Sequence, residues 1–173
     1  MCNIYAPNDD NPDFFVKTYR MIEQFDNEFK IISGDFNLVM DVNLDKRGNP
    51  MTHINSLETI KMYNEEADII DIWRHRNSDS FRYTWKRRNP NPIMCRLDIF
   101  FISSSLLGNV VDSDILTSFK SDHSVITLDL IFDSIPRGKG FWKLNTSILK
   151  DLDYVQNINN TCLLYTSPSP RDS

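Results

Sequence analysis

A chain of 173 residues is long enough for one compact domain and leaves little for a second. Hydrophobic residues make up 40% of the chain and charged residues 25%, with a net charge of −5, which is typical of a globular protein. No apolar run approaches the roughly 18 residues of a membrane-spanning helix, which argues against an integral membrane protein. The glycines, 5 in all, form neither GxGxxG nor GxxxxGK[ST], which argues against dinucleotide-binding and P-loop enzymes.

The first half of the chain is predicted to alternate strands and helices. The expected elements are the end of a strand at 2–6, a helix at 12–28, a buried strand at 29–33 and a helix at 56–67. Asn11 suits the N-cap of the first helix, and Ser56 suits the cap of the second. The buried strand is expected to stop at Gly34, and the polar stretch 38–55 is typical of a loop.

The second half is predicted to be rich in strands. Phe81, Tyr83 and Trp85 alternate with polar residues, a pattern typical of a half-buried strand with one polar face. Further along we expect a strand at 94–103, a helical turn at 104–109 and strands at 110–116 and 124–132. This mixed order of helices and strands favours a layered α/β sandwich.

The composition changes twice near the C-terminus and predicts three segments. They are a domain at 1–135, a connector at 136–160 and a tail at 161–173. The tail resembles the translated adaptor read-through that ends many transcriptome-derived sequences, so we do not expect it to contribute to the fold.

The cysteines indicate a reducing compartment. Cys2, Cys95 and Cys162 are odd in number and far apart, which predicts neither a disulfide framework nor a zinc site. The N-terminus also shows no signal peptide. An intracellular location, cytoplasmic or nuclear, is therefore expected.

The charges are unevenly distributed although the chain is acidic overall. Residues 74–100 carry seven arginines or lysines against two aspartates, a net charge of +5, which favours a surface that holds phosphate. The residues expected to contact phosphate or DNA are Arg82, Lys86, Arg87, Arg88 and Arg96. Ordinary solvated basic loops are the alternative interpretation.

Three segments place polar side chains at strand ends or inside an apolar strand, where a structural role is hard to justify. The segment 33–37 carries Asp35 and Asn37, the segment 96–102 carries Arg96 and Asp98 on one face, and the segment 121–123 is Ser-Asp-His. Together they supply three carboxylates, a carboxamide and an imidazole. Such a set suits metal-assisted phosphoester hydrolysis, in which carboxylates bind Mg²⁺ and act on water while an imidazole stabilises phosphoryl charge.

Four segments also carry a resemblance to a known family. They are Asn3-Ile4-Tyr5-Ala6-Pro7-Asn8, Gly34-Asp35-Phe36-Asn37, Arg96-Leu97-Asp98 and Ser121-Asp122-His123. In order and spacing they resemble the endonuclease/exonuclease/phosphatase superfamily, the DNase-I-like group that includes AP endonucleases. Two further segments, 81–85 and 137–145, are most similar to the endonuclease domain of non-LTR, LINE-type retrotransposon polyproteins. The resemblance covers roughly residues 1–150.

The resemblance implies catalytic roles for the matching residues. Asp35 would orient or deprotonate the attacking water, and Asn37 would help to hold water and phosphate. His123 would bind a non-bridging oxygen of the scissile phosphate, and Asp98 would fix the orientation of that imidazole. Tyr5 would be a further catalytic residue lining the phosphate pocket.

The resemblance also implies a cofactor and partners. Asp122 would belong to a site for Mg²⁺ or Mn²⁺, and Asn8 would line the phosphate pocket beside it. DNA would be the substrate. In the parent polyprotein, the partners would be the N-terminal half of the domain and a downstream reverse transcriptase.

The family pattern contains an Asn and a strand-end Glu, the main metal ligand, ahead of the part that matches this chain. The fold is therefore expected to be a partial four-layer α/β sandwich that lacks its N-terminal strands. A half domain buries little apolar surface, so we expect the chain to be inactive alone. A catalytically dead fragment or binding module is the first alternative, and a phosphatase or phospholipase of the same superfamily is the second.

Overall fold

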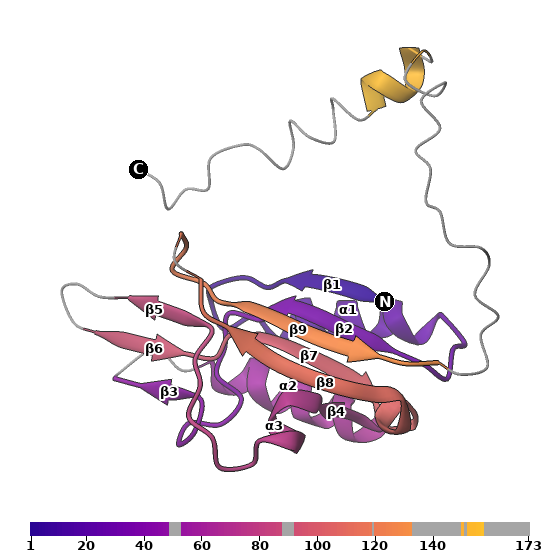
Figure 1. Ribbon diagram of the computed structural model, residues 1–173. Helices are drawn as coiled ribbons and strands as arrows, with labels where there is room; N and C mark the ends of the chain where they lie inside the picture. The colour runs from indigo at the N-terminus through magenta and orange to yellow at the C-terminus, as the bar shows by residue number, and fades with distance from the viewer. Residues whose placement is uncertain (49–52, 88–91, 119, 133–149, 151, 158–173) are drawn as a thin grey trace. The chain divides into compact units, whose positions relative to one another are not determined.

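The computed structural model describes residues 1–48, 53–87, 92–118, 120–132, 150 and 152–157 (Figure 1). The chain divides into two compact units, Met1–Phe132 and Asp133–Ser173. In the second unit, the described residues include a short helix over 152–157. The expected connector and tail otherwise lie outside the described residues. No helix in the described part is long and apolar enough to cross a membrane.

A mixed four-stranded sheet forms the centre of the first unit. Its strands follow the order β1 (Cys2–Tyr5), β2 (Ile31–Asp35), β7 (Asp98–Ser103) and β4 (Ile69–Asp71). β1 pairs with β2 in parallel, whereas β7 runs antiparallel to both β2 and β4. Two smaller sheets accompany it: β8 (Val110–Leu116) pairs with β9 (Val125–Leu130), and β6 (Ile93–Cys95) lies between β3 (Lys46–Arg47) and β5 (Trp85–Arg87).

The two faces of β7 show how the layers are built. Ile99 and Phe101 belong to the core that the main sheet forms with α1 (Pro12–Glu23) and α2 (Ile54–Glu66). Phe100 and Ile102, which point to the opposite face, pack in a second core with Val110 and Leu128 of the β8–β9 sheet and Ile72 of the short helix α3 (Ile72–Arg76). The main sheet therefore lies between a helical layer and a second sheet, as Figure 1 shows, and the expected α/β sandwich is confirmed.

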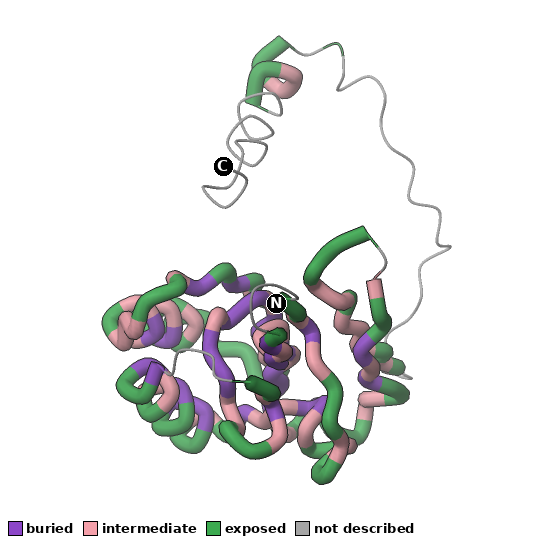
Figure 2. Tube along the Cα trace, turned by 90° about the vertical axis from the view of Figure 1, so that its left-hand side faces the viewer, coloured by how far each residue is buried: buried purple, intermediate pink, exposed green. Residues whose placement is uncertain are grey.

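The helical layer is held by stacked aromatic side chains. Asn11 caps α1 by accepting a hydrogen bond from the backbone N–H of Phe14, as expected. Tyr19 stacks on Tyr63 of α2 with ring centroids 5.0 Å apart, and its hydroxyl donates to the side chain of Asn64 at 2.5 Å. The buried residues of the first unit accordingly concentrate between its helices and strands (Figure 2).

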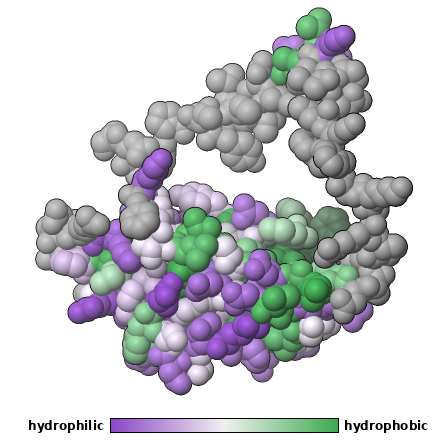
Figure 3. All heavy atoms as spheres, in the orientation of Figure 1, coloured by the Kyte–Doolittle hydropathy of each residue, from purple (hydrophilic) through white to green (hydrophobic). Residues whose placement is uncertain are grey.

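The outer face of the β8–β9 sheet is mixed in character. Val111, Leu116 and Val125 are about half exposed there, at 54%, 49% and 56%. Figure 3 shows groups of hydrophobic residues among hydrophilic ones on this face. An antiparallel sheet commonly packs one side on the core and leaves the other in solvent.

Several expected boundaries were wrong in the first half. The first helix ends at Glu23 rather than at residue 28. The second helix begins at Ile54 with His53 at its N-cap, so Ser56 lies inside its first turn, where its N–H and hydroxyl both donate to Asp10. β2 does not stop at Gly34 but continues to Asp35, which matters for the site.

The expected strand at 81–86 was also wrong in its facing. Only Trp85–Arg87 is a strand. Trp85 is partly buried and Lys86 is exposed, as expected, but Phe81 is 61% exposed and Thr84 is completely buried. The expected strand at 94–103 is two strands, β6 and β7, in different sheets. The helical turn is present as a 3₁₀ helix, η1 (Ser104–Asn109).

Candidate active site

Three of the candidate residues occupy paired positions on neighbouring strands of the main sheet. Tyr5 at the end of β1 lies opposite Asp35 at the end of β2, and Asp35 lies opposite Asp98 at the start of β7. Asp35 is only 8% exposed, whereas Tyr5 is 65% exposed. The sheet therefore presents two carboxylates side by side at one edge, although Asp98 was expected inside a strand and instead begins β7.

Gly34 allows β1 and β2 to come close enough for this pairing. Its φ is +132°, and a Cβ at this position would meet the carbonyl oxygen of Ile4 at 1.9 Å. A residue with a side chain can neither adopt this conformation readily nor leave β1 so close to β2. The glycine that was expected to end the strand instead permits β1 and β2 to pair up to Tyr5 and Asp35.

His123 reaches the two carboxylates from the segment between β8 and β9. Its Nδ1 lies 2.9 Å from Oδ2 of Asp98, and its Nε2 lies 3.9 Å from Oδ2 of Asp35. The hydrogen bond with Asp98 raises the pKa of His123 above its ordinary value, although partial burial opposes this effect. The nearby charges of Asp35 and Asp122 raise it further. The imidazole is therefore biased toward its positively charged form.

Asn37 closes the turn that follows Asp35. Its φ of 50° is left-handed, a conformation that Asn tolerates better than most residues. Its backbone N–H donates to Oδ1 of Asp35 at 2.9 Å, and its side-chain Nδ2 donates to the carbonyl of Ala6 at 2.6 Å. The carboxamide thus joins the ends of β1 and β2 next to Asp35.

Asp122 lies beside this group rather than within it. Its carboxylate is exposed and accepts a hydrogen bond from Nε1 of Trp85 at 2.9 Å. Asn8, the other residue expected in the phosphate pocket, is exposed on the segment after β1.

The basic residues expected to contact phosphate or DNA differ in their exposure and in their partners. Lys86 and Arg87 are exposed on β5. Arg82 donates a hydrogen bond to the carbonyl of Ile115 and lies 3.8 Å from Asp114. Arg88 lies outside the described residues.

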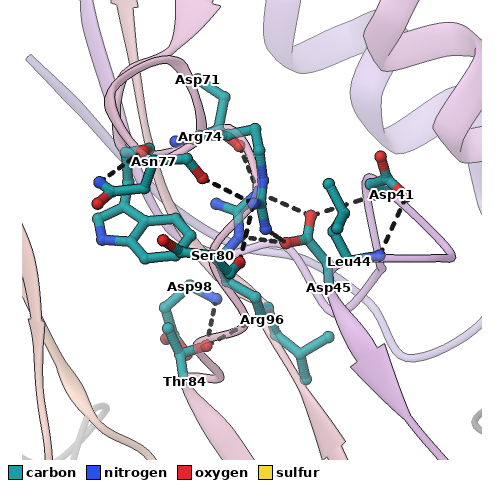
Figure 4. A network of polar contacts seen from close by, with 12 residues as sticks. Asp41, Leu44, Asp45, Asp71, Arg74, Asn77, Ser80, Thr84, Arg96 and Asp98 are labelled. Carbon is teal, nitrogen blue, oxygen red and sulfur yellow. Dashed lines mark hydrogen bonds and ion pairs between the residues drawn. The ribbon is translucent and has the colours of Figure 1, made fainter.

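Arg96 requires a correction, because it is 1% exposed and cannot contact DNA from this position. Its Nε and Nη2 donate to the two carboxylate oxygens of Asp45 at 2.7 and 2.8 Å, and its Nη2 also donates to Asp71 at 2.5 Å. Figure 4 shows this pair with Arg74, which donates to Asp45 as well. Arg96 and Asp98 do not share a strand face, because Arg96 precedes β7 in an irregular segment.

This buried network is structural and was missed by the sequence analysis. Burial raises the pKa of Asp45, but the hydrogen bonds and charges of Arg96 and Arg74 outweigh it and hold the pKa below its ordinary value. Both guanidinium groups also lie over the ring of Trp73, at 5.0 and 5.4 Å from its centroid. Asp45 stood in a polar stretch expected to be a loop, and nothing in its spacing pointed to an arginine so far along the chain.

Thr84 is a second residue that the sequence analysis missed. Its buried hydroxyl accepts hydrogen bonds from the backbone N–H groups of Leu97 and Asp98, both at 2.9 Å. Its carbonyl accepts from the N–H of Ser124 at 2.6 Å. One residue therefore holds both the segment that presents Asp98 and the segment that presents His123.

A polar hollow adjoins His123 on the side of Asp122. It is lined by Lys86, Thr117, Ser118, Lys120, Ser121, Asp122 and Ser124. Two ammonium groups and several hydroxyls are donors suited to phosphate oxygens.

The donor set fits a hard divalent cation. Asp35, Asp98 and His123 each offer a ligand atom, and these atoms all lie within 4.8 Å of one another. Mg²⁺ is usually held by one or two carboxylates together with water and substrate phosphate, and Asp122 adds a further carboxylate nearby. Two of the three ligand atoms are carboxylate oxygens, and the third is an imidazole nitrogen that binds a metal only when it is unprotonated.

Comparisons with known proteins agree with this architecture. No protein-family profile matches the chain. An uncharacterized 149 kDa protein of transposon TX1 from Xenopus laevis is 28% identical over 166 residues, which is 93% of this chain and 12% of that protein. An AP endonuclease from Archaeoglobus fulgidus has a TM-score of 0.64 at 18% identity, covering 76% of this chain and 60% of its own.

A 3′ phosphatase from Neisseria, NExo, solved with a product DNA hairpin, gives a TM-score of 0.56 at 16% identity. The match covers 75% of this chain and 60% of that one. The chain thus spans a small part of the transposon protein and less than two thirds of either solved structure. These likenesses show that the chain shares its fold with these enzymes.

Proposed function

We propose that this chain, which belongs by fold to the DNase-I-like endonuclease/exonuclease/phosphatase superfamily, carries the hydrolytic residues of a DNA endonuclease of the LINE-type retrotransposon kind. The observation that carries the proposal is the meeting of Asp35, Asp98 and His123 at one sheet edge. The likeness to a transposon protein supports the retrotransposon assignment.

Asp35 is the residue that acts on water in this proposal. It is 8% exposed, and one of its oxygens accepts the N–H of Asn37, so its orientation is fixed before a substrate binds. A carboxylate held in this way can accept a proton from a water molecule placed for attack on phosphorus. Asn37 supports that geometry by tying the turn to β1.

His123 stabilises charge on the phosphoryl group. Asp98 holds Nδ1 and raises the pKa of the ring, which leaves Nε2 to donate toward a non-bridging oxygen. A donor already oriented toward developing negative charge lowers the barrier without further reorganisation. Asp98 therefore acts through His123 and is a positioning residue.

Mg²⁺ or Mn²⁺ is the proposed cofactor, with Asp122 as a ligand. Asp122 presents an exposed carboxylate, one oxygen of which accepts the indole N–H of Trp85, whereas Asp35 and Asp98 are largely buried and hydrogen-bonded to Asn37 and His123. When bound, the cation would neutralise negative charge on the phosphate and stabilise the charge that develops on the leaving oxygen.

DNA is the proposed substrate, and an intracellular site of action follows from it. One structural relative was solved with a DNA hairpin. In this chain, Lys86 and Arg87 are exposed on β5, and Lys86 shares the hollow beside Asp122 with Lys120. Such cations neutralise backbone phosphates without reading sequence. Tyr5 ends β1 opposite Asp35 and Asn8 follows it by three residues, and we assign both to the phosphate pocket.

A phosphatase acting on DNA 3′ ends is the second candidate, because the Neisseria relative is described as a 3′ phosphatase. The same residues would serve either reaction, since both hydrolyse a phosphoester. The two differ in where the phosphate lies on the strand.

The test uses supercoiled plasmid and a 3′-phosphorylated oligonucleotide, each with Mg²⁺. The 173-residue chain is compared with the same residues expressed within the longest protein that their gene encodes. We expect the longer protein to convert supercoiled plasmid to the nicked form. Release of phosphate from the oligonucleotide without nicking would favour the phosphatase, and neither reaction in either protein would favour a binding module.

A further inference from the structure

Asp122 stands on a segment that has little to hold its side chain. Residues 120–122 form bends without helix or strand, and the Asp122 carboxylate is exposed. An exposed Asp samples several rotamers, and a carboxylate that must meet a cation benefits from being fixed beforehand. One side chain provides such a restraint: Nε1 of Trp85 donates to Oδ2 of Asp122 at 2.9 Å.

The backbone fixes these two residues relative to each other. Trp85 forms an antiparallel bridge with His123. The N–H of Lys86 donates to the carbonyl of Asp122 at 3.0 Å, and the N–H of Ser124 donates to the carbonyl of Thr84 at 2.6 Å. The segment that carries Asp122 and His123 is therefore aligned along the start of β5.

The indole ring is anchored on its apolar side. Trp85 packs against the buried cluster formed by Val39, Ile93 and Cys95. A tryptophan in this position has a fixed body and a polar edge that faces outward. Its N–H direction, and with it the orientation of the Asp122 carboxylate, is set by packing.

The chemistry of the donor is as important as its position. An indole N–H is a neutral donor, so it orients the carboxylate without cancelling the charge that attracts a cation. A lysine or arginine at the same place would compete with the metal. Only one oxygen of Asp122 receives this hydrogen bond; the other, Oδ1, lies 3.4 Å from the Ser121 hydroxyl.

We infer that Trp85 is a positioning residue that holds the Asp122 carboxylate for the divalent cation. The inference rests on the proposed function, because it takes Asp122 as a metal ligand. It assigns to the aromatic residue of β5 a role in metal affinity rather than in binding DNA.

The first measurement needs neither metal nor activity. The chain has 3 tryptophans, so a ¹H–¹⁵N spectrum of the full chain contains three indole signals, and the signal lost in Trp85→Phe is that of Trp85. We expect this signal to shift upfield in Asp122→Ala, because the charged acceptor is removed. An indole signal of Trp85 that stays in place in Asp122→Ala would overturn the inference.

The second measurement is the affinity for Mn²⁺ alone, followed by the electron paramagnetic resonance signal of free Mn²⁺. We expect Trp85→Phe, which keeps an aromatic ring, to weaken Mn²⁺ binding by about tenfold. This is the lower end of the loss in affinity observed when a residue hydrogen-bonded to a metal ligand is replaced. Trp73→Phe is the matched control, because the indole N–H of Trp73 has no hydrogen-bond partner in the described part of the chain. Far-UV circular dichroism checks that each variant is folded. Equal Mn²⁺ affinity in Trp85→Phe and Trp73→Phe would overturn the role of Trp85 but not the metal site. Absence of Mn²⁺ binding by the unmodified chain would overturn both this inference and the proposed metal site.

Discussion

Asp35 and Asp98 lie directly opposite each other across the antiparallel pair of β2 and β7. Two like charges facing each other across strands destabilise a sheet. His123 contacts both carboxylates, at 3.9 and 2.9 Å, and its positive form offsets their repulsion. The arrangement that suits catalysis therefore also makes the local fold dependent on the imidazole.

The ionisation of His123 gives the first prediction. Because the hydrogen bond with Asp98 is the main cause of its raised pKa, Asp98→Asn should lower that pKa more than Asp35→Asn does. A raised folded pKa means that the stabilisation is fully present below the unfolded pKa and is lost as the pH rises through the folded one. Titration of the ring resonances by NMR measures the pKa of His123 in each variant. A pKa of His123 that is unchanged in Asp98→Asn would contradict the pairing.

Gly34 gives the second prediction. Gly34→Ala should lower the free energy of unfolding by more than about 2 kcal/mol, because the methyl group meets the Ile4 carbonyl and the backbone has a positive φ. Gly108→Ala is the matched control, since a Cβ there meets nothing within 4 Å. Urea unfolding of both variants checks this. Similar stability of the two variants would show that β1 and β2 need no close approach at Gly34.

Short sequence motifs predicted that the candidate carboxylates would come together. Local pattern assigned Asp35 to a strand end and Asp98 to a polar position inside an apolar strand, and the two strands do meet in one sheet. The restraints that hold them were not predictable, because they join residues far apart in the chain. Thr84 holds Asp98 through a hydroxyl 14 positions away in sequence. The alternation of aromatic and polar residues at 81–86 placed Thr84 on a polar face, whereas in the structure Thr84 is completely buried.

The fold was predicted in outline, and its boundaries were wrong where tertiary contacts override local preference. Ser56 has the chemistry of an N-cap, yet Asp10 supplies the capping carboxylate from another segment and α2 begins earlier. Arg96 was assigned to phosphate because of its basic neighbourhood. Its two carboxylate partners come from positions 51 and 25 residues away, which no local pattern reveals.

The buried network of Arg96 gives the third prediction. Arg96→Leu should lower the free energy of unfolding by about 3–5 kcal/mol, because it leaves Asp45 buried without its main partner. The control is Arg76→Leu, since Arg76 pairs with Asp112 at 3.7 Å on the surface and such pairs contribute at most about 1 kcal/mol. Chemical denaturation measures both losses. Equal losses in the two variants would contradict the assignment of Arg96 to the interior.

Asp10 gives a prediction on acid stability. Hydrogen bonds from Ser56, with smaller ones from Asn55, lower the pKa of Asp10 from 3.8 to about 2. A lowered folded pKa means that the stabilisation is present above the unfolded pKa and is lost as the pH falls through the folded one.

Asp10→Asn should therefore be less stable than the unmodified chain near neutral pH, and the difference should shrink as the pH falls from about 4 toward about 2. Unfolding by urea over a pH series measures it, and Asp9→Asn provides a control of equal charge change. A difference that stays constant with pH would contradict the capping role.

The most direct test of the site is plasmid nicking by matched variants of the longest protein that the gene of this chain encodes. Asp35→Asn and His123→Ala each remove one group proposed to act at the phosphate, and Asp129→Asn makes the same chemical change as the first variant at an exposed position on β9. Removing a general base or a charge-stabilising donor costs roughly 10²–10³ in rate. We predict that Asp35→Asn and His123→Ala each nick at least about a hundredfold more slowly, with Asp129→Asn unaffected. Nicking by both site variants at the rate of Asp129→Asn would contradict the assignment of catalysis to this sheet edge.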